Sequence, residues 1–271
     1  MASLSTTTFA ATDTPFDLPP LTTTLVPLSE VQSLKLIHLQ DPKGGSFSQS
    51  KKQCDLWEYV WGTSLIFCRL LHSVPWHENV SVLEVGCGAA LCGLTVALKG
   101  AKVLSTDLVE DSIIIAQQSA EANQIPKENI LFEKRNWEKL DAFEENKYDV
   151  VLGSDVLFYR GAAPHVAKVI HKSMKMKGCA LIADPVRLNV NDFCSRLNDL
   201  GCTTYVRQFV GSNESIEQIS LLTNGKKSFV KITKAKLVVV QMASNSNEIG
   251  SNSGNEIVKA ILEMTEPFVE E

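Results

Sequence analysis

The sequence predicts an α/β protein whose mostly parallel β-sheet carries helices on both faces and ends in an antiparallel edge hairpin. Short apolar runs alternate with segments of helical periodicity along most of the chain. Two of these runs, residues 150–152 and 180–183, are continuously apolar, which is typical of parallel strands buried on both faces. After Gly201 the segments become strand-rich, which indicates the antiparallel edge.

The order of the elements follows from this periodicity and from the turn residues between them. Residues 22–39 are expected to add a strand or a short hairpin, and a first helix is expected over residues 56–71. The expected strands of the sheet are residues 80–85, 102–106, 130–134, 148–153, 178–184, 203–210 and 228–241. The expected helices are residues 91–99, 110–123, 164–174 and 191–200, with a further short helix near residues 256–264.

These elements fit one domain with an extension at each end. A chain of 271 residues has room for one large α/β domain and does not demand two. We expect residues 1–50 to form a partly disordered N-terminal extension and residues 51–242 to form the functional domain. Residues 243–271 are rich in Asn, Ser, Gly and Glu, and we expect them to form a C-terminal tail.

Composition excludes several classes of function. The formal net charge of −5 supplies no global basic field that would attract nucleic acid or an anionic membrane. No stretch approaches the roughly 18 apolar residues of a transmembrane helix. Seven cysteines without a C-x-x-C pair indicate a reducing compartment, and the five histidines show no metal-ligand spacing. The Ser/Thr-rich start lacks arginine, so organelle targeting is not favoured, although it stays open.

An apolar strand that runs into two glycines is the strongest functional signal in the chain. Residues 82–85 lead directly into Gly86, Cys87 and Gly88, a helix is expected to follow, and Asp107 ends the next strand. Glycines allow a tight turn and let a ligand approach the backbone, because no Cβ stands in the way. An acidic residue about 20 positions further on can accept both hydroxyls of a ribose. The pattern predicts a nucleotide-type cofactor site; the alternative is a tight turn without a ligand.

The residues around the glycines distinguish between cofactors. A dinucleotide fingerprint needs a third glycine at position 91, where this chain has Leu91. Glu84 lies just before the glycines, where a carboxylate can hold a cationic group. S-adenosylmethionine has an amino group and a sulfonium but no phosphate, so an acidic strand end suits it better than it suits a pyrophosphate. The sequence therefore favours S-adenosylmethionine over a dinucleotide.

Together these residues resemble those of the class I methyltransferases that use S-adenosylmethionine, and more narrowly the protein-modifying group called family 16. The resemblance extends from Leu56 to Asp184 and keeps the order of the family's motifs. Its segments are residues 60–66, 84–88, 106–108, 136–137 and 153–158. It implies a Rossmann-like fold with a seven-stranded sheet, S-adenosylmethionine as the cofactor, and methylation of a protein side-chain nitrogen, on lysine before arginine.

The resemblance also implies roles for particular residues. The implied cofactor-binding residues are Trp61, Glu84, Gly86, Cys87, Gly88, Asp107, Leu108, Asn136, Trp137 and Ser154. Asp155 is implied to face the acceptor nitrogen, and Phe158 or Tyr159 to form the wall of its channel. Plainer alternatives stay open at this stage. The tryptophans suit ordinary packing, one of Phe158 and Tyr159 suits the core, and Asp155 suits a cap of the following segment.

The chain departs from the family at several positions. Ala90 stands where glycine is usual, and Gly62 stands where proline is common. Residues 154–156 and the first helix resemble the member associated with histone arginine methylation. Residues 183–187 instead resemble members that methylate lysine on metabolic or translation proteins. The acceptor is therefore left open. Residues 153–156 do not form the asparagine-proline-proline-aromatic motif of nucleobase amino methylases, which argues against a nucleic-acid substrate.

The resulting expectation is an S-adenosylmethionine-dependent protein N-methyltransferase that needs no metal. The sulfonium is already an excellent leaving group, so the protein mainly positions the nucleophile and excludes water. Two alternatives remain: a small-molecule methyltransferase, and a cofactor-binding interaction protein without catalysis. We expect a protein substrate, no nucleic-acid or membrane partner, a monomeric state, and a cytoplasmic and/or nuclear location.

Overall fold

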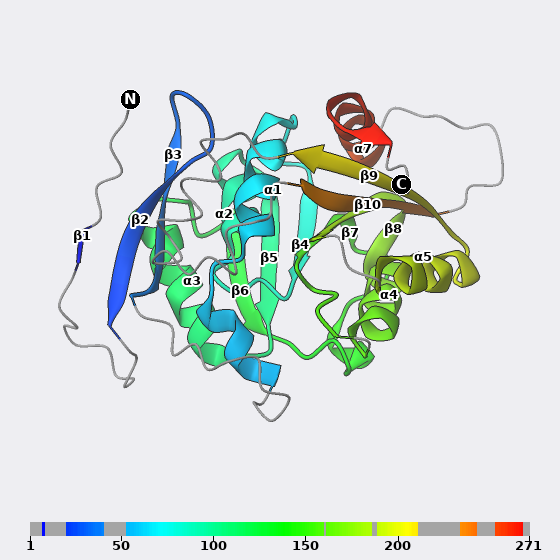
Figure 1. The fold of residues 1–271 in the computed structure, drawn as a ribbon, viewed down its shortest axis with the longest axis horizontal. Helices are drawn as coiled ribbons and strands as arrows, with labels where there is room; N and C mark the ends of the chain where they lie inside the picture. Colours follow the sequence, from blue (N-terminus) through cyan, green and yellow to red (C-terminus); the bar gives the residue numbers. More distant parts are fainter. Residues whose placement is uncertain are drawn as a thin grey trace.

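An eight-stranded β-sheet forms the centre of the molecule (Figure 1). The computed structural model describes residues 7–8, 20–40, 53–159, 161–185, 189–210, 234–242 and 253–267. Across the sheet the strands lie in the order β11-β9-β10-β8-β7-β4-β5-β6. In chain order they are β4 (Ser81–Val85), β5 (Lys102–Asp107), β6 (Ile130–Lys134), β7 (Tyr148–Ser154), β8 (Met174–Pro185), β9 (Cys202–Val210), β10 (Lys234–Met242) and β11 (Glu266–Pro267).

The sheet is parallel from β6 to β8 and antiparallel beyond it. β4 pairs with β5 on one side and with β7 on the other, both in parallel, and β10 runs antiparallel between β8 and β9. Strand order therefore reverses between β4 and β7. The predicted α/β fold with its antiparallel edge is confirmed. In open α/β sheets the carboxyl ends of the strands at such a reversal point form the ligand site.

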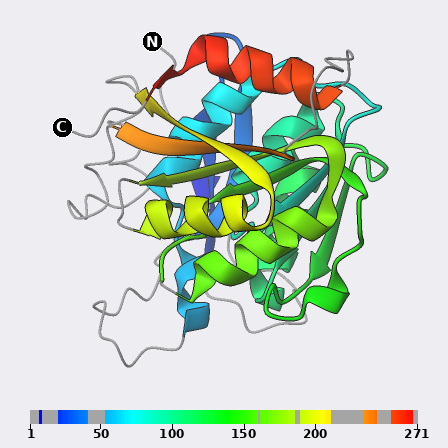
Figure 2. The same ribbon diagram turned by 90° about the vertical axis from the view of Figure 1, so that its right-hand side faces the viewer.

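Helices cover both faces of the sheet and bury one hydrophobic cluster on each (Figure 2). One face carries α1 (Gly62–Ser73), α2 (Leu91–Leu98), α3 (Glu110–Ala122) and α7 (Ser253–Met264). The other face carries α4 (Ala162–Ser173) and α5 (Asn189–Asp199). Successive residues of a strand point to opposite faces of the sheet and so belong to different clusters. On β7, Val150 and Leu152 face α2, while Val151 faces α4. This two-sided burial explains why the central strands are continuously apolar.

The first expected helix is interrupted in the structure. Residues 53–58 form a short 3-10 helix, η1 (Gln53–Glu58), and α1 begins only at Gly62. Trp61 has an extended backbone, with φ −80° and ψ 140°, as the N-cap residue of α1. The Oγ of Ser64 donates to the Trp61 carbonyl at 2.7 Å, and the indole Nε1 of Trp61 donates to the Leu56 carbonyl at 3.1 Å. The prediction of one continuous helix over residues 56–71 was wrong, because these bonds fix Trp61 outside the helix.

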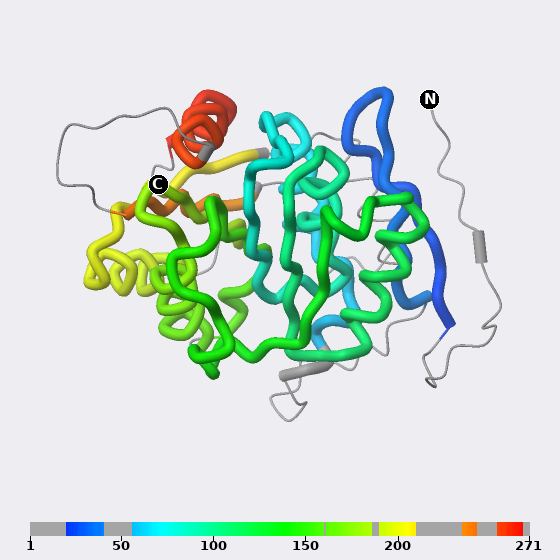
Figure 3. The backbone as a smooth tube through the Cα atoms, turned by 180° about the vertical axis from the view of Figure 1, so that it is seen from behind, coloured from blue at the N-terminus to red at the C-terminus, as the bar shows by residue number. Residues whose placement is uncertain are grey.

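Within the expected N-terminal extension, a hairpin packs beside α3 (Figure 3). The hairpin consists of β2 (Leu21–Pro27) and β3 (Ser33–Leu39), and β1 (Thr7–Thr8) pairs with β2. Helix side chains bond to the free edge of β3. The backbone N–H of Ile37 donates to the Ser119 Oγ at 2.9 Å, and that of Lys35 donates to the Asn123 Oδ1 at 2.8 Å. The hairpin alternative for residues 22–39 is therefore confirmed.

At the other end of the chain, residues 253–267 pack against the sheet. Ile257, Val258 and Ile261 of α7 are buried in the same cluster as α1 and α2. β11 pairs with β9, and the Nη2 of Arg207 on β9 donates to the Leu262 carbonyl at 2.9 Å. The short helix expected near residues 256–264 is thus α7. In the described part of the chain, no helix is long and apolar enough to cross a membrane.

Candidate functional site

A cavity of about 250 Å³ opens at the carboxyl ends of β4, β5 and β7, where the strand order reverses. Its size is near the lower end of small-molecule sites, which start at roughly 300 Å³. Every site residue singled out from the sequence lines it. These are Trp61, Glu84, Gly86, Cys87, Gly88, Asp107, Leu108, Asn136, Trp137, Ser154, Asp155, Phe158 and Tyr159. The structure thus brings them together around one cavity, while the binding role of each stays a prediction.

The glycine loop after β4 is fixed by its backbone and by a tryptophan. Gly86 has φ +63°, which disfavours other residues. A Cβ at Gly86 would lie 2.8 Å from the Cζ3 of Trp137, so the indole ring leaves no room for a side chain. The backbone N–H of Cys87 donates to the Thr106 carbonyl at 2.9 Å. These contacts hold the loop in this conformation, and Trp137 packs directly on it.

Asp107 is held by two backbone donors. Its Oδ2 accepts the N–H of Gly88 at 2.8 Å, and its Oδ1 accepts the N–H of Val109 at 3.0 Å. Burial raises the pKa of Asp107, although these hydrogen bonds oppose the shift. Each carboxylate oxygen retains a second lone pair. The side chain is therefore oriented by the protein and can still accept hydroxyl groups of a ribose.

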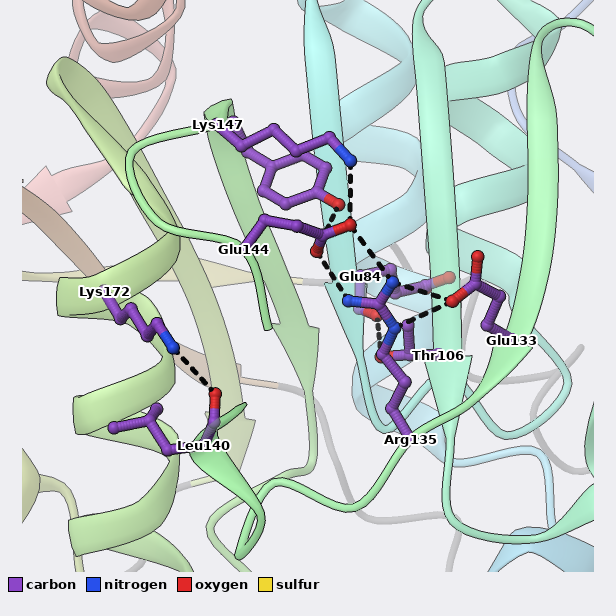
Figure 4. Close-up of polar contacts among 9 residues, drawn as sticks. Glu84, Thr106, Glu133, Arg135, Leu140, Glu144, Lys147 and Lys172 are labelled. Carbon is purple, nitrogen blue, oxygen red and sulfur yellow. Dashed lines mark hydrogen bonds and ion pairs between the residues drawn. The ribbon is translucent and has the colours of Figure 1, made fainter. Parts of the chain in front are cut away.

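Glu84 is buried, with 3 % of its surface exposed, and both of its carboxylate oxygens have protein donors. Oε1 accepts the N–H of Gly93 at 2.9 Å, and Oε2 accepts the hydroxyl of Ser105. Burial raises the pKa of Glu84 to about 7, although both hydrogen bonds lower it. Glu84 thus anchors the start of α2 to β5. Its backbone carbonyl also accepts the hydroxyl of Thr106 at 2.7 Å (Figure 4). A direct contact with a cationic cofactor tail stays a prediction.

Asp155 lies at the cavity in an unusual backbone conformation. Its φ is +58°, a left-handed conformation that Asp tolerates better than most residues. Its N–H donates to the Ala183 carbonyl at 2.9 Å, and the N–H of Leu157 donates to the Asp184 Oδ2 at 3.3 Å. These bonds fix the turn to the end of β8. The cap alternative does not hold for α4, whose N-cap residue is Gly161 without a side-chain cap.

Aromatic rings line the walls beside Asp155. The Trp137 and Phe158 ring centroids are 6.5 Å apart, and those of Phe158 and Tyr159 are 5.0 Å apart. A second pair, Tyr59 and Trp61, has centroids 5.8 Å apart. Phe158 and Tyr159 both line the cavity, so neither is simply a core residue. Aromatic faces attract cationic groups through their quadrupole.

The sequence analysis missed several residues that line the same cavity. Trp57 and Tyr59 had been placed in a continuous helix, and the break before α1 brings them to the cavity wall. Arg135 and Phe143 also line it, from the loop after β6. The position of Arg135 directly before Asn136 and Trp137 was the available signal. Its partner Glu144 lies nine residues further on, and no periodicity connects the two.

Comparison with known proteins identifies the family. A family profile described as lysine methyltransferase matches residues 43–198, more than half of the chain. The chain belongs to this lysine methyltransferase family.

Individual relatives agree with this assignment. The protein N-lysine methyltransferase METTL21A of Xenopus tropicalis is 30% identical over 179 residues, 60% of this chain and 80% of that protein. The histone-arginine methyltransferase METTL23 of Mus musculus is 32% identical over 106 residues, 37% of this chain and 41% of that protein. In fold alone, the chain is similar to the precorrin 8w decarboxylase of Methanobacterium thermoautotrophicum, with a TM-score of 0.51 and 14% identity over 76% of this chain and 97% of that structure.

The chain is therefore an S-adenosylmethionine-dependent methyltransferase, and its cavity suits that cofactor. The Oγ of Ser154 is buried at the cavity without a hydrogen-bond partner among the described residues, so it can bond to a ligand. Binding of the ribose by Asp107 and of the adenine by Trp137 stays a prediction. The acidic lining of Glu84, Asp107 and Asp155 suits a ligand that carries an ammonium and a sulfonium group. When bound, S-adenosylmethionine supplies an electrophilic methyl group.

Proposed function

We propose that this methyltransferase modifies a side-chain nitrogen of a protein, on lysine before arginine. The observation that carries the proposal is the buried carboxylate of Asp155, 6 % exposed, at the cavity beside Phe158 and Tyr159. A buried carboxylate in a cavity lined by aromatic rings suits a cationic side chain, because both attract positive charge. The METTL21A relative supports lysine, and the shorter match to METTL23 keeps arginine as the second choice.

The residues suggest how the acceptor is prepared. Asp155 attracts the ammonium of a lysine, accepts a hydrogen bond from it, and so aims the nitrogen at the cofactor side of the cavity. The nitrogen must lose a proton before its lone pair can form the new N–C bond, while the C–S bond breaks on the opposite side. A positioned carboxylate can take part in this proton transfer. Phe158, Tyr159 and Trp137 exclude water from the path.

A labelling experiment tests the proposal. Purified protein is incubated with radiolabelled S-adenosylmethionine and a cell extract, beside the variants Asp155→Asn and Asp155→Ala. We expect a protein band labelled by the wild type, with turnover reduced by about 10²-fold or more in both variants. Mass spectrometry of the band then identifies the residue that carries the methyl group.

The controls separate catalysis from folding. Asp192→Asn removes an exposed carboxylate that pairs with Arg196 on α5, and it should leave labelling unchanged. Asp155→Asn should still bind S-adenosylmethionine, as measured by calorimetry. Label that appears only in small molecules would reject the protein acceptor. Cofactor binding without any labelled product would favour a role without catalysis.

The proposal extends to the state and location of the protein. We propose that it works as a monomer in the cytoplasm and/or nucleus on a protein substrate. The six cysteines whose side chains the structure describes are free thiols. Burial raises the pKa of Cys68 and of Cys179 to about 12, so these two thiols react slowly. Light scattering of the purified chain and imaging of the tagged chain test the two parts.

A further inference from the structure

The loop after β6 forms one wall of the cofactor cavity. It leaves the sheet at Lys134, passes through η2 (Leu140–Ala142), and reaches β7 at Tyr148. Between these points Arg135, Asn136, Trp137, Glu138 and Phe143 line the cavity. Residues 135–147 belong to no strand. Backbone hydrogen bonds hold the two ends of the loop, and side-chain contacts add to them.

One side chain joins the two ends of this loop. The Nη1 of Arg135 donates to the Oε2 of Glu144 at 2.6 Å, and its Nη2 donates to the Oε1 at 3.3 Å. On the side of β6, the Nε and Nη2 of Arg135 donate to the Oε2 of Glu133 at 2.9 and 2.7 Å. Figure 4 shows the guanidinium between the two carboxylates. We call Arg135, Glu133 and Glu144 the Arg135 network.

The network is buried on the arginine side. The Arg135 side chain is only 10% exposed, while Glu133 and Glu144 are 48% and 38% exposed. A bidentate arginine–carboxylate pair fixes orientation as well as distance. Burial opposes the charge of Arg135, yet the hydrogen bonds with Glu144 and Glu133 prevail and raise its pKa. The guanidinium therefore stays charged and keeps both partners.

Glu144 is itself fixed by further contacts. Its carboxylate accepts hydrogen bonds from the Lys147 Nζ at 2.8 Å and from the Tyr148 hydroxyl at 3.2 Å. Arg135 also lies over the ring of Phe143, 5.6 Å from its centroid. The loop is thus tied to the first residues of β7 at one end. At its other end the N–H of Arg135 donates to the carbonyl of Asp107 at 2.8 Å.

We infer that Arg135 is a positioning residue that places Trp137 against the glycine loop and so sets the affinity for S-adenosylmethionine. Trp137 lies two residues after Arg135, and its ring occupies the space that a Cβ of Gly86 would need. With the network broken, residues 135–143 lose the side-chain tie between Arg135 and Glu144, and Trp137 loses its fixed position. The inference concerns cofactor binding and holds whichever acceptor the enzyme uses.

Cofactor affinity without any acceptor is the measurement that tests this inference. The dissociation constant of S-adenosylmethionine is determined by calorimetry for the wild type and for Arg135→Ala, Arg135→Lys and Glu144→Gln. We expect Arg135→Ala and Glu144→Gln to weaken binding by about tenfold or more, the equivalent of about 1.4 kcal/mol. Arg135→Lys keeps the charge but loses the bidentate geometry, so it should restore only part of the affinity.

Two further measurements separate positioning from general stability. Arg196→Ala removes an arginine–carboxylate pair far from the cavity, with Asp192 at 2.9 Å, and should leave the dissociation constant unchanged. The emission of Trp137, obtained as the difference from the Trp137→Phe variant, should change in Arg135→Ala.

The outcomes show whether Arg135 positions Trp137 or only stabilises the fold. A folded Arg135→Ala protein that binds S-adenosylmethionine within about twofold of the wild type overturns the inference. Equal losses of affinity in Arg135→Ala and Arg196→Ala overturn it as well, because both would then report general destabilisation. If Arg135→Ala does not fold, Glu144→Gln and Arg135→Lys give the decision. None of these results depends on the protein acceptor.

Discussion

The buried acid Glu84 makes the free energy of unfolding depend on pH. The pKa of Glu84 is raised from 4.5 to about 7 by burial. In the unfolded chain the pKa of Glu84 is near 4.5, so the folded state binds this proton more tightly. The contribution of Glu84 to the free energy of unfolding is therefore greatest below pH 4.5 and is lost as the pH rises to about 7. A shift of this size corresponds to a loss on the order of 3 kcal/mol. The free energy of unfolding should therefore fall over this range in the protein without cofactor.

Glu84→Gln isolates this contribution. Glutamine keeps an acceptor for the N–H of Gly93 and cannot ionise, so the variant should lose the slope that Glu84 adds between pH 4.5 and 7. Urea unfolding at a series of pH values measures both proteins, and the difference between the two curves cancels the other titrating groups. A difference that stays constant with pH would show that Glu84 does not titrate in this range.

Gly86 supports a second prediction at the residue scale. In Gly86→Ala the new Cβ meets the Trp137 ring at 2.8 Å, so the ring must move and S-adenosylmethionine should bind about tenfold more weakly. Gly201→Ala is the matched control. Gly201 has φ +81° and no atom within 4 Å of an added Cβ, so it shares the backbone strain without the contact. Calorimetry of both variants checks the prediction; equal affinities would contradict it.

At the scale of elements, the sequence predicted what local pattern determines. Strands β4 to β9 and helices α2 to α5 were expected within a few residues, because apolar periodicity and glycines mark them. Of the strand expected over residues 228–241, residues 228–233 lie outside the described residues, and β11 was not expected. β8 is longer than expected and begins at Met174, since pairing with β7 extends it beyond the apolar run. The interruption before α1 was missed because Trp57 and Trp61 fit a helical face equally well.

Contacts between distant elements account for what local pattern could not predict. A strand pattern in the sequence does not show which helix side chain will bond to the edge of that strand. The bond from the Ile37 N–H to the Ser119 Oγ is an example. The pairing of Arg135 with Glu144 likewise depends on how a loop closes in space. The site residues themselves were placed by motif order, and all of them line one cavity.

For the whole molecule, the C-terminal segment is part of the domain's core. Ile257 and Ile261 are 1 % and 0 % exposed and pack in the cluster that also contains α1 and α2. At the start of α7 a Cβ on Gly254 would lie 3.2 Å from the Cα of Gly178, so helix and sheet approach closely. Arg207 ties the end of α7 to β9. A tail was predicted from the polar composition of residues 243–271, and composition alone does not show that the apolar residues of α7 pack against the sheet.

One variant tests whether α7 shares the stability of the domain. Ile261→Ala removes a fully buried side chain and should lower the free energy of unfolding by about 2–5 kcal/mol. Met264→Ala, on the same helix but 40% exposed, is the control and should cost less than about 1 kcal/mol. Urea unfolding followed by circular dichroism and by tryptophan emission should give coincident single transitions for both. If α7 were an independent tail, Ile261→Ala would leave the midpoint of the tryptophan transition unchanged, because all four tryptophans lie between residues 57 and 137.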